Sequence, residues 1–229
     1  KALGLQFYVR LSFRDDSDKF LGDANIWKRA ESMIAKVAAD EKLETVIGLG
    51  EAAFYGPKLD FLVKDALGRE WQCATIQLDF VQPERFGLSY TDSDGKEKRP
   101  VMIHKALLGS IERFISVYIE HTNGNFPLWL SPVQIKVIPI RENHNAFAKE
   151  ISDALKNNGV RVKLDDSDEG LGKKVRAAKV DKIPYWLVIG DKEMAEGKVT
   201  LESRDKGKIG EFTLESLKQL LKKEIDEKI

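Results

Sequence analysis

The hydrophobic pattern of this chain changes its period near residue 130, and that change limits the folds available to it. Before this point, short segments with period two follow one another: Thr45–Leu49, Lys58–Lys64 and Glu70–Phe80. Period two with tight Gly- and Pro-containing connections is typical of a mostly antiparallel sheet. After residue 130, strands alternate with helical segments of about 10–15 residues, which predicts βαβ units and a largely parallel sheet. We therefore expect two domains, residues 1–131 and 132–229, with the boundary in the segment FPLWLSP.

Further elements follow from the same patterns. The first domain is expected to begin with a strand, Leu5–Phe13, followed by a helix from Asn25 to about Glu41 with Asp23 as N-cap. A second helix is expected to open at Gly109 and to end near His121. The second domain is expected to contain strands at Val133–Pro139, Val160–Leu164, Tyr185–Ile189 and Lys198–Ser203, and helices at Glu142–Asn157, Gly172–Val180 and Thr213–Lys228.

Composition excludes several classes of protein. With 42% hydrophobic and 32% charged residues the chain is too apolar to be disordered, and no apolar run approaches the ~20 residues of a membrane helix. Its single cysteine, Cys73, allows no internal disulfide, which favours a reducing compartment. We expect a cytoplasmic protein with no membrane partner. Because the chain starts at Lys1 without an initiator methionine, we expect it to be a piece of a longer protein.

Two segments carry side chains that could bind a small polar ligand. In EWQCATIQLDF, Thr75 and Gln77 share the polar face of a strand, where neutral donors and acceptors could form a binding floor; the alternative is a sheet with one solvated face. In GEAAFYGPK, Tyr55 and Lys58 flank a Gly-Pro turn, and the lysine is a point cation suited to an anionic oxygen; the alternative is a hairpin with a solvated lysine.

A third segment, VMIHKALLGSIERF, places His104 at the end of a strand just before a helix. Glycine inside a helix costs about 1 kcal/mol relative to alanine, so Gly109 suggests a close approach to the backbone. Arg113, four residues on, has the planar fork that suits a base or a phosphate. The alternatives are a hydrogen-bonded structural histidine and a solvated helix arginine.

In order and spacing, GEAAFYGPKLDF, WQCATIQLDF, PVMIHKALLGSIERF and FPLWLSPVQ resemble the C-terminal half of the class II catalytic core of threonyl-tRNA synthetases, with GSIERF similar to motif 3. NNGVRVKLDD and KIPYWLVIGDKE resemble the anticodon-binding domain that this family shares with the prolyl, histidyl and glycyl synthetases. The resemblance covers essentially the whole chain. It implies a partial α+β antiparallel-sheet class II core, followed by an α/β anticodon-binding domain with a mixed, largely parallel sheet.

The activity that the resemblance implies is ATP-dependent activation of threonine to threonyl-adenylate and transfer to the 3′ end of tRNA(Thr), with Mg²⁺ accompanying ATP. The implied roles are threonine binding by Tyr55, Thr75 and Gln77, catalysis by Lys58 and Arg113, ATP binding by Gln72, Gly109, Ser110 and Arg113, and zinc binding by His104. A zinc ion that coordinates the threonine hydroxyl would reject valine, which an apolar pocket cannot do well.

Several parts of the family pattern have no counterpart in this sequence: motif 1, which forms the dimer interface, motif 2, and the other two zinc ligands. Cys73 corresponds to a position beside the pocket and not to a ligand. We therefore expect the isolated chain to be inactive and to bind zinc weakly or not at all, and the full-length enzyme to be a homodimer.

A basic run in the second domain is typical of contact with the phosphates of an RNA stem-loop: Lys173, Lys174, Arg176, Lys179 and Lys182. No DNA partner is expected. A solvated helix face is the alternative. The resemblance places Arg176, Lys182 and Glu193 at the tRNA anticodon. Asp168 and Glu202 stand where relatives commonly carry asparagine and arginine, and Arg204 is a candidate substitute for the latter.

Two other identities fit the sequence less well. A non-catalytic RNA-binding paralogue built from the same domains would have no need of the pocket residues, and a prolyl-tRNA synthetase would not need His104 in its apolar pocket.

Overall fold

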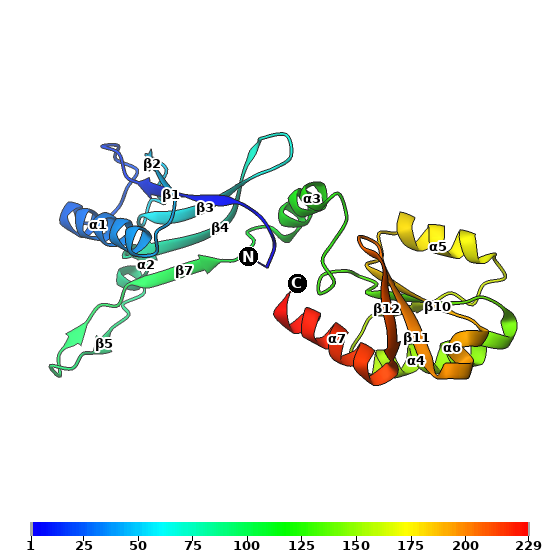
Figure 1. The fold of residues 1–229 in the computed structure, drawn as a ribbon. Coiled ribbons are helices and arrows are strands. Elements are labelled where there is room, and N and C mark those ends of the chain that lie inside the picture. The colour runs from blue at the N-terminus through cyan, green and yellow to red at the C-terminus, as the bar shows by residue number, and fades with distance from the viewer. Residues whose placement is uncertain (1, 229) are drawn as a thin grey trace. The chain divides into compact units, whose positions relative to one another are not determined.

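The computed structural model describes residues 2–228, which form two compact units, Leu3–His121 and a second that begins at Thr122 (Figure 1). Each is described by itself. The segment that was expected to hold the boundary is bonded within the second unit: Arg161 donates to the carbonyl oxygens of Trp129 and Ser131, at 2.9 Å each, and Gln134 donates to that of Leu128, also at 2.9 Å. The division at residue 131 stays a prediction.

The first unit is built on a five-stranded sheet in the order β2-β1-β3-β4-β7. The strands are β1 (Phe7–Phe13), β2 (Thr45–Leu49), β3 (Lys58–Lys64), β4 (Glu70–Asp79) and β7 (Met102–Ala106). Only the β1/β2 pair is parallel, so the mostly antiparallel sheet is confirmed. The unit is completed by α1 (Ala24–Asp40), α2 (Val81–Arg85), the hairpin of β5 (Tyr90–Thr91) and β6 (Glu97–Lys98), and α3 (Ile111–Thr122).

Helix α1 starts where its N-cap predicted. The Asp23 carboxylate accepts hydrogen bonds from the first free N–H groups of the helix, as such a cap does. Ile34 and Ala38 pack on the sheet with Val9 and Leu59. The apolar residues of α1 extend beyond its buried face, because three of them are about half exposed: Ile26 (46%), Met33 (51%) and Val37 (47%).

Helix α3 begins at Ile111, so the expectation that Gly109 opens it is wrong. Gly109 lies before the helix with a φ of +59°, in the left-handed region that glycine adopts without strain. The nearest atoms to a Cβ added there would be the carbonyl oxygens of Gln72 and Cys73, at an ordinary 3.5 Å. The backbone conformation by itself favours glycine here, and the close approach to this backbone stays a prediction. Because Gly109 precedes the helix, Arg113 does not share a helix face with it.

The second unit has a mixed sheet in the order β12-β11-β10-β8-β9. Strand β8 pairs in parallel with β9 and β10, whereas β11 pairs antiparallel with β10 and β12. The strands are β8 (Ile135–Pro139), β9 (Val162–Leu164), β10 (Tyr185–Ile189), β11 (Lys198–Ser203) and β12 (Gly207–Thr213). The helices are η1 (Glu142–His144), α4 (Asn145–Asn157), α5 (Leu171–Val180), α6 (Asp191–Glu196) and α7 (Leu214–Glu227); neither β12 nor α6 was predicted.

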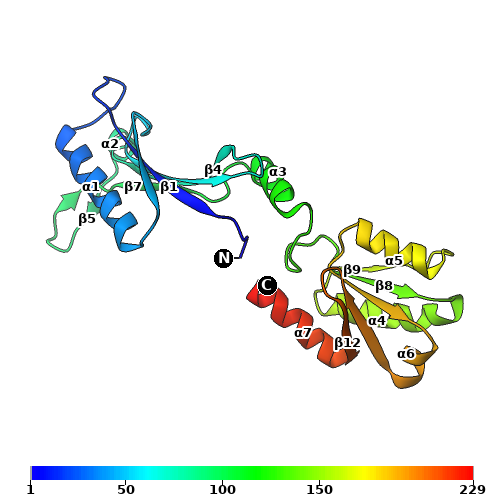
Figure 2. The ribbon, with the colours of Figure 1, turned by 45° about the horizontal axis from the view of Figure 1, so that its top comes forward.

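Helices cover both faces of this sheet (Figure 2). On one face α4 and α7 enclose the main core, in which Leu155, Leu187, Leu201, Leu217 and Leu221 are fully buried. On the other, α5 packs through Ala178 onto Ile138 and Trp186. Both units are therefore sheet-and-helix layers, and among residues 2–228 we find no helix with the length and apolar character needed to cross a membrane.

Candidate functional site

The register of the first sheet aligns polar side chains in two adjacent rows. One row is Arg10, Asp60 and Thr75, and the next is Ser12, Lys58, Gln77 and His104. Their alternate neighbours, such as Leu11, Leu59 and Ile76, pack towards α1, so the rows lie on the opposite face. Residues from four strands therefore form one polar floor, which includes Thr75 and Gln77.

Lys58 is held inside this floor. Its side chain is 14% exposed, and Nζ lies 3.1 Å from Oδ2 of Asp60, whose side chain is fully buried. The Thr75 hydroxyl donates to Oδ1 of the same carboxylate at 2.8 Å. Sequence reasoning missed Arg10, Ser12 and Asp60, although the alternation in FYVRLSF and KLDF contains them.

Tyr55 and His104 stand together at the edge of the floor. The Tyr55 hydroxyl donates to Oε1 of Gln77, and the Tyr55 and His104 rings are 5.5 Å apart between centroids. Burial, with the nearby charge of Asp79, raises the pKa of the Tyr55 hydroxyl, which keeps it a donor. His104 Nε2 lies 2.8 Å from Oδ2 of Asp79, a buried carboxylate that also accepts two main-chain N–H groups at the start of α2.

Among residues 2–228 no three His, Cys, Asp or Glu side chains gather in a way that could hold a metal ion. His104 has one ring nitrogen engaged by Asp79, which leaves a single nitrogen for coordination. One imidazole does not make up the three protein ligands of a catalytic zinc, so these residues alone do not fit that ion. Burial raises the pKa of the Cys73 thiol, which makes it a poorer ligand still.

A β-bulge between β3 and β4 positions Gln72. The register of β3 against β4 shifts between Phe61 and Leu62, which brings Gln72 opposite Leu62 and so onto the face of Lys58. Simple period two would have assigned Gln72 to the other face.

Beyond the bulge, the predicted ATP-binding residues after β7 lie at the start of α3. The Ser110 hydroxyl accepts from the Arg113 N–H at 3.3 Å and donates to Glu112 at 2.7 Å. The Arg113 guanidinium is exposed, 5.9 Å from the Trp71 ring centroid. An exposed guanidinium over an aromatic ring is free to meet a planar or anionic guest.

The predicted anticodon residues do not gather at one point of the second unit. Arg176 is exposed on α5, Lys182 precedes β10, and Glu193 follows it on α6, so the last two mark opposite ends of one strand. Both Glu193 oxygens are engaged, one by the Gly190 N–H at 3.1 Å and the other by the Thr200 hydroxyl at 2.9 Å.

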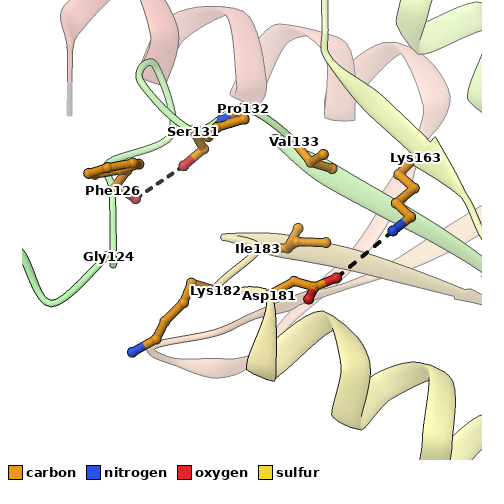
Figure 3. A pocket seen from close by; sticks show the side chains of 9 residues that line it. All are labelled: Gly124, Phe126, Ser131, Pro132, Val133, Lys163, Asp181, Lys182 and Ile183. Atoms are coloured by element: carbon orange, nitrogen blue, oxygen red, sulfur yellow. Dashed lines mark hydrogen bonds and ion pairs between the residues drawn. The ribbon is translucent and has the colours of Figure 1, made fainter. Parts of the chain in front are cut away.

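The two ends of the parallel strands carry separate cavities. Lys182 lines one of about 370 Å³, where Phe126, Pro132 and Ile183 supply apolar walls and Lys163 faces Asp181 at 3.9 Å (Figure 3). Asp168 lines another, of about 360 Å³, beyond the carboxyl ends of the strands; it also contains Arg141 and Lys174.

Of the two sequence departures, Glu202 has a local partner. Glu202 accepts from the indole N–H of the buried Trp186 at 3.0 Å. Arg204 is not available as a substitute cation, because its guanidinium is engaged by Asp205 and by the carbonyl oxygens of Lys182 and Phe126.

Comparisons with known proteins match each of the two units to a different domain family. Residues 1–122 match the tRNA synthetase class II core domain (G, H, P, S and T), and residues 134–224 match the anticodon binding domain. The threonine–tRNA ligase of Chlorobium phaeobacteroides is 51% identical over 96% of this chain, and that of a Thermus thermophilus strain is 50% identical over 93%. The chain spans about a third of the length of these curated relatives (34% and 32%).

Solved structures give the same result. The RNA binding domain of threonyl-tRNA synthetase from Cryptosporidium parvum aligns with a TM-score of 0.88 and 39% identity, over 96% of this chain and 56% of that one. A putative threonyl-tRNA synthetase from Aeropyrum pernix aligns with a TM-score of 0.77 and 32% identity, over 97% and 55%. The resemblance indicated by the motifs is confirmed. The chain contains a class II tRNA synthetase core domain and, after it, an anticodon-binding domain. It belongs to the class II tRNA synthetase core family (G, H, P, S and T), and within that family it is similar to the threonine–tRNA ligases.

Proposed function

We propose that the protein containing this chain activates threonine with ATP and transfers the threonyl group to the 3′ end of tRNA(Thr). The observation that carries the proposal is the pair of polar rows on the first sheet, in which cationic, hydroxyl and amide groups from four strands converge. The relatives named above, all threonine–tRNA ligases, support the choice of amino acid.

In this proposal the floor binds threonine by its polar ends. The Lys58 ammonium meets the substrate carboxylate, while Tyr55, Thr75 and Gln77 surround its amino group. Arg10 and Lys58 carry two positive charges, and Asp60 and Glu51, which also pairs with Arg10, carry two negative ones. The attraction for an anion is therefore local to Lys58, which has N–H groups beyond the one that faces Asp60. A carboxylate held there would lie in position to attack the α-phosphate.

ATP, with Mg²⁺, is proposed to lie towards the start of α3. Arg113 would stack on adenine and neutralise charge on the γ-phosphate, and Gln72, Gly109 and Ser110 would line the nucleotide side. A guanidinium near developing phosphate charge stabilises the transition state. We propose no step through zinc, because His104 alone does not supply its ligand set.

The second unit is proposed to bind the anticodon stem-loop through Arg176, Lys182 and Glu193. Residues 1–131 and 132–229 are proposed as the working domains, the full-length protein as a cytoplasmic homodimer. Binding of tRNA(Thr) to the chain, followed by fluorescence anisotropy over a salt series, tests the RNA contacts. Arg176→Ala and Lys182→Ala should each lower the salt slope by about 1, whereas Lys28→Ala in α1 should leave it unchanged.

Threonine-dependent ATP–pyrophosphate exchange by the full-length gene product tests the catalytic proposal. Exchange with threonine that exceeds exchange with valine supports it. Absence of exchange with threonine, together with retained tRNA(Thr) binding, would instead favour a non-catalytic RNA-binding paralogue. The persistence of Tyr55, Lys58, His104 and Arg113 in one unit argues against that alternative, since RNA binding alone requires none of them.

A further inference from the structure

Asp60 is the fully buried member of the polar floor, and four side chains contact it. Its side chain is fully buried. Oδ2 accepts from the Ser12 hydroxyl at 2.7 Å and lies 3.1 Å from Lys58 Nζ and 3.4 Å from Arg10 Nη2. Oδ1 accepts from the Thr75 hydroxyl at 2.8 Å. No other carboxylate described in the first unit joins β1, β3 and β4 in this way, so Asp60 couples three strands of the candidate site.

These contacts set the direction of hydrogen bonding at the floor. A hydroxyl group has one proton, so Thr75 and Ser12, having donated to Asp60, present only lone pairs to a guest. Lys58 has three N–H donors and spends one on Asp60, which leaves the others for an acceptor. The same carboxylate thus makes the hydroxyls acceptors, suited to an ammonium group, and holds a donor suited to a carboxylate.

Because Lys58 is largely buried, its contact with Asp60 also fixes the position of its ammonium group. A lysine side chain has four methylene groups and high rotamer freedom in water. At 14% exposure, with its ammonium against Asp60, it is held in one place before any substrate arrives. The strand pairing does not need this side chain, because the register of β1, β3 and β4 is made by main-chain bonds.

We propose that Asp60 is a positioning residue for amino-acid activation: it places the Lys58 ammonium group for the substrate carboxylate. Asp60 does not touch the substrate. This role rests on the proposed function and deepens it, since it assigns the orientation of the amino acid to a buried residue that acts only through its neighbours.

A double-mutant cycle with the full-length gene product tests the role. Asp60→Asn keeps the volume but places a donor or a neutral acceptor against Lys58, Arg10 and Ser12. We expect kcat/KM for threonine in pyrophosphate exchange to fall about 10- to 100-fold, the range for loss of a hydrogen bond to a charged group. In a Lys58→Ala background the same change should cost less than about threefold, because its effect passes through Lys58.

The matched control is Asp165→Asn in the second unit. It makes the same chemical change at a carboxylate that also holds a buried lysine, Lys136, at 2.6 Å. Exchange does not require tRNA, so this variant should keep wild-type kcat/KM. If Asp60→Asn fails to fold, Ser12→Ala carries the test, because it removes one donor from Asp60 and leaves no unpaired charge; a loss of about three- to tenfold is expected, and none in the Lys58→Ala background.

The outcomes separate the two claims. A wild-type protein without threonine-dependent exchange overturns the proposed function and this role with it. A wild-type protein that exchanges, with a folded Asp60→Asn variant of unchanged kcat/KM, overturns only the role of Asp60. Fully additive losses in the double mutant would also overturn it, because they would show a structural effect that does not act through Lys58.

Discussion

Gly56 supports the turn that carries Tyr55 and Lys58, and its replacement by alanine gives a quantitative test of the structure. A Cβ built on Gly56 would lie 1.9 Å from the carbonyl oxygen of Leu78 in β4. To restore an ordinary contact near 3.4 Å, the turn and the strand must separate by about 1.5 Å. The neighbouring hydrogen bonds, Leu78 N–H to Pro57 at 3.1 Å and Phe80 N–H to Tyr55 at 3.3 Å, cannot survive that displacement.

The loss can be worked from those two bonds. At about 0.5–1.5 kcal/mol each, they amount to roughly 1–3 kcal/mol of unfolding free energy. For a unit of this size, at roughly 4 °C per kcal/mol, the transition should move down by about 4–12 °C. Differential scanning calorimetry of the 229-residue chain is the assay, because two compact units allow two transitions and only that of the first unit should shift.

Gly172→Ala is the matched control. Gly172 lies in α5, and an added Cβ would meet no atom within 4 Å. Alanine in a helix is favoured over glycine by about 0.5–1 kcal/mol, so the transition of the second unit should rise slightly. A Gly56→Ala chain whose first transition stays within about 1 °C of wild type would refute the close packing of this turn on β4.

Three further results are expected. Burial would raise the pKa of Asp65, but hydrogen bonds from Trp71 and Arg69 outweigh it and lower the pKa to about 2. This carboxylate therefore stabilises the folded state at pH values above 3.8, its ordinary pKa, and the stabilisation is lost as the pH falls towards 2. Asp65→Asn should lower the melting temperature of the first unit at pH 6 but not near pH 2. A difference in melting temperature between variant and wild type that stays constant with pH would contradict this. Equilibrium dialysis of the metal-free chain should give well under one zinc per chain, whereas stoichiometric zinc that is lost in His104→Ala would show that the ligand set is sufficient. Leu217→Ala, at a fully buried position, should destabilise the second unit by about 2–5 kcal/mol and leave the first transition in place, as read from the same calorimetric scans.

The strands were predictable wherever one face is buried. Period two in KLDFLVK and EWQCATIQLD corresponds closely to β3 and β4, because alternate residues pack towards α1. Strand β12 escaped prediction since Gly207 and Gly210 interrupt its pattern with residues that carry no hydrophobic signal. The bulge that moves Gln72 to the other face is a register effect between two strands, which one strand's sequence does not contain.

Some residues of the candidate site were predictable, but the contacts among them were not. Tyr55, Lys58 and Gln77 could be named from motifs, yet their shared surface depends on which residues face each other across three strand pairs. Asp60 was passed over because an acid two residues after Lys58 reads as an ordinary charged strand position. Only its complete burial and its four donors distinguish it.

Strand β2 is an edge strand of the first sheet, so one of its sides has no strand partner among the described residues. The side chains of Val46, Ile47 and Leu49 are 46%, 66% and 71% exposed. Strand β2 contains no charged residue and no proline, and these are the residues that usually prevent an edge strand from pairing with a strand of another molecule. The purified 229-residue chain should therefore self-associate as its concentration rises. Ile47→Lys should raise the concentration at which the sample stays monodisperse, a practical gain for anyone preparing it for solution study.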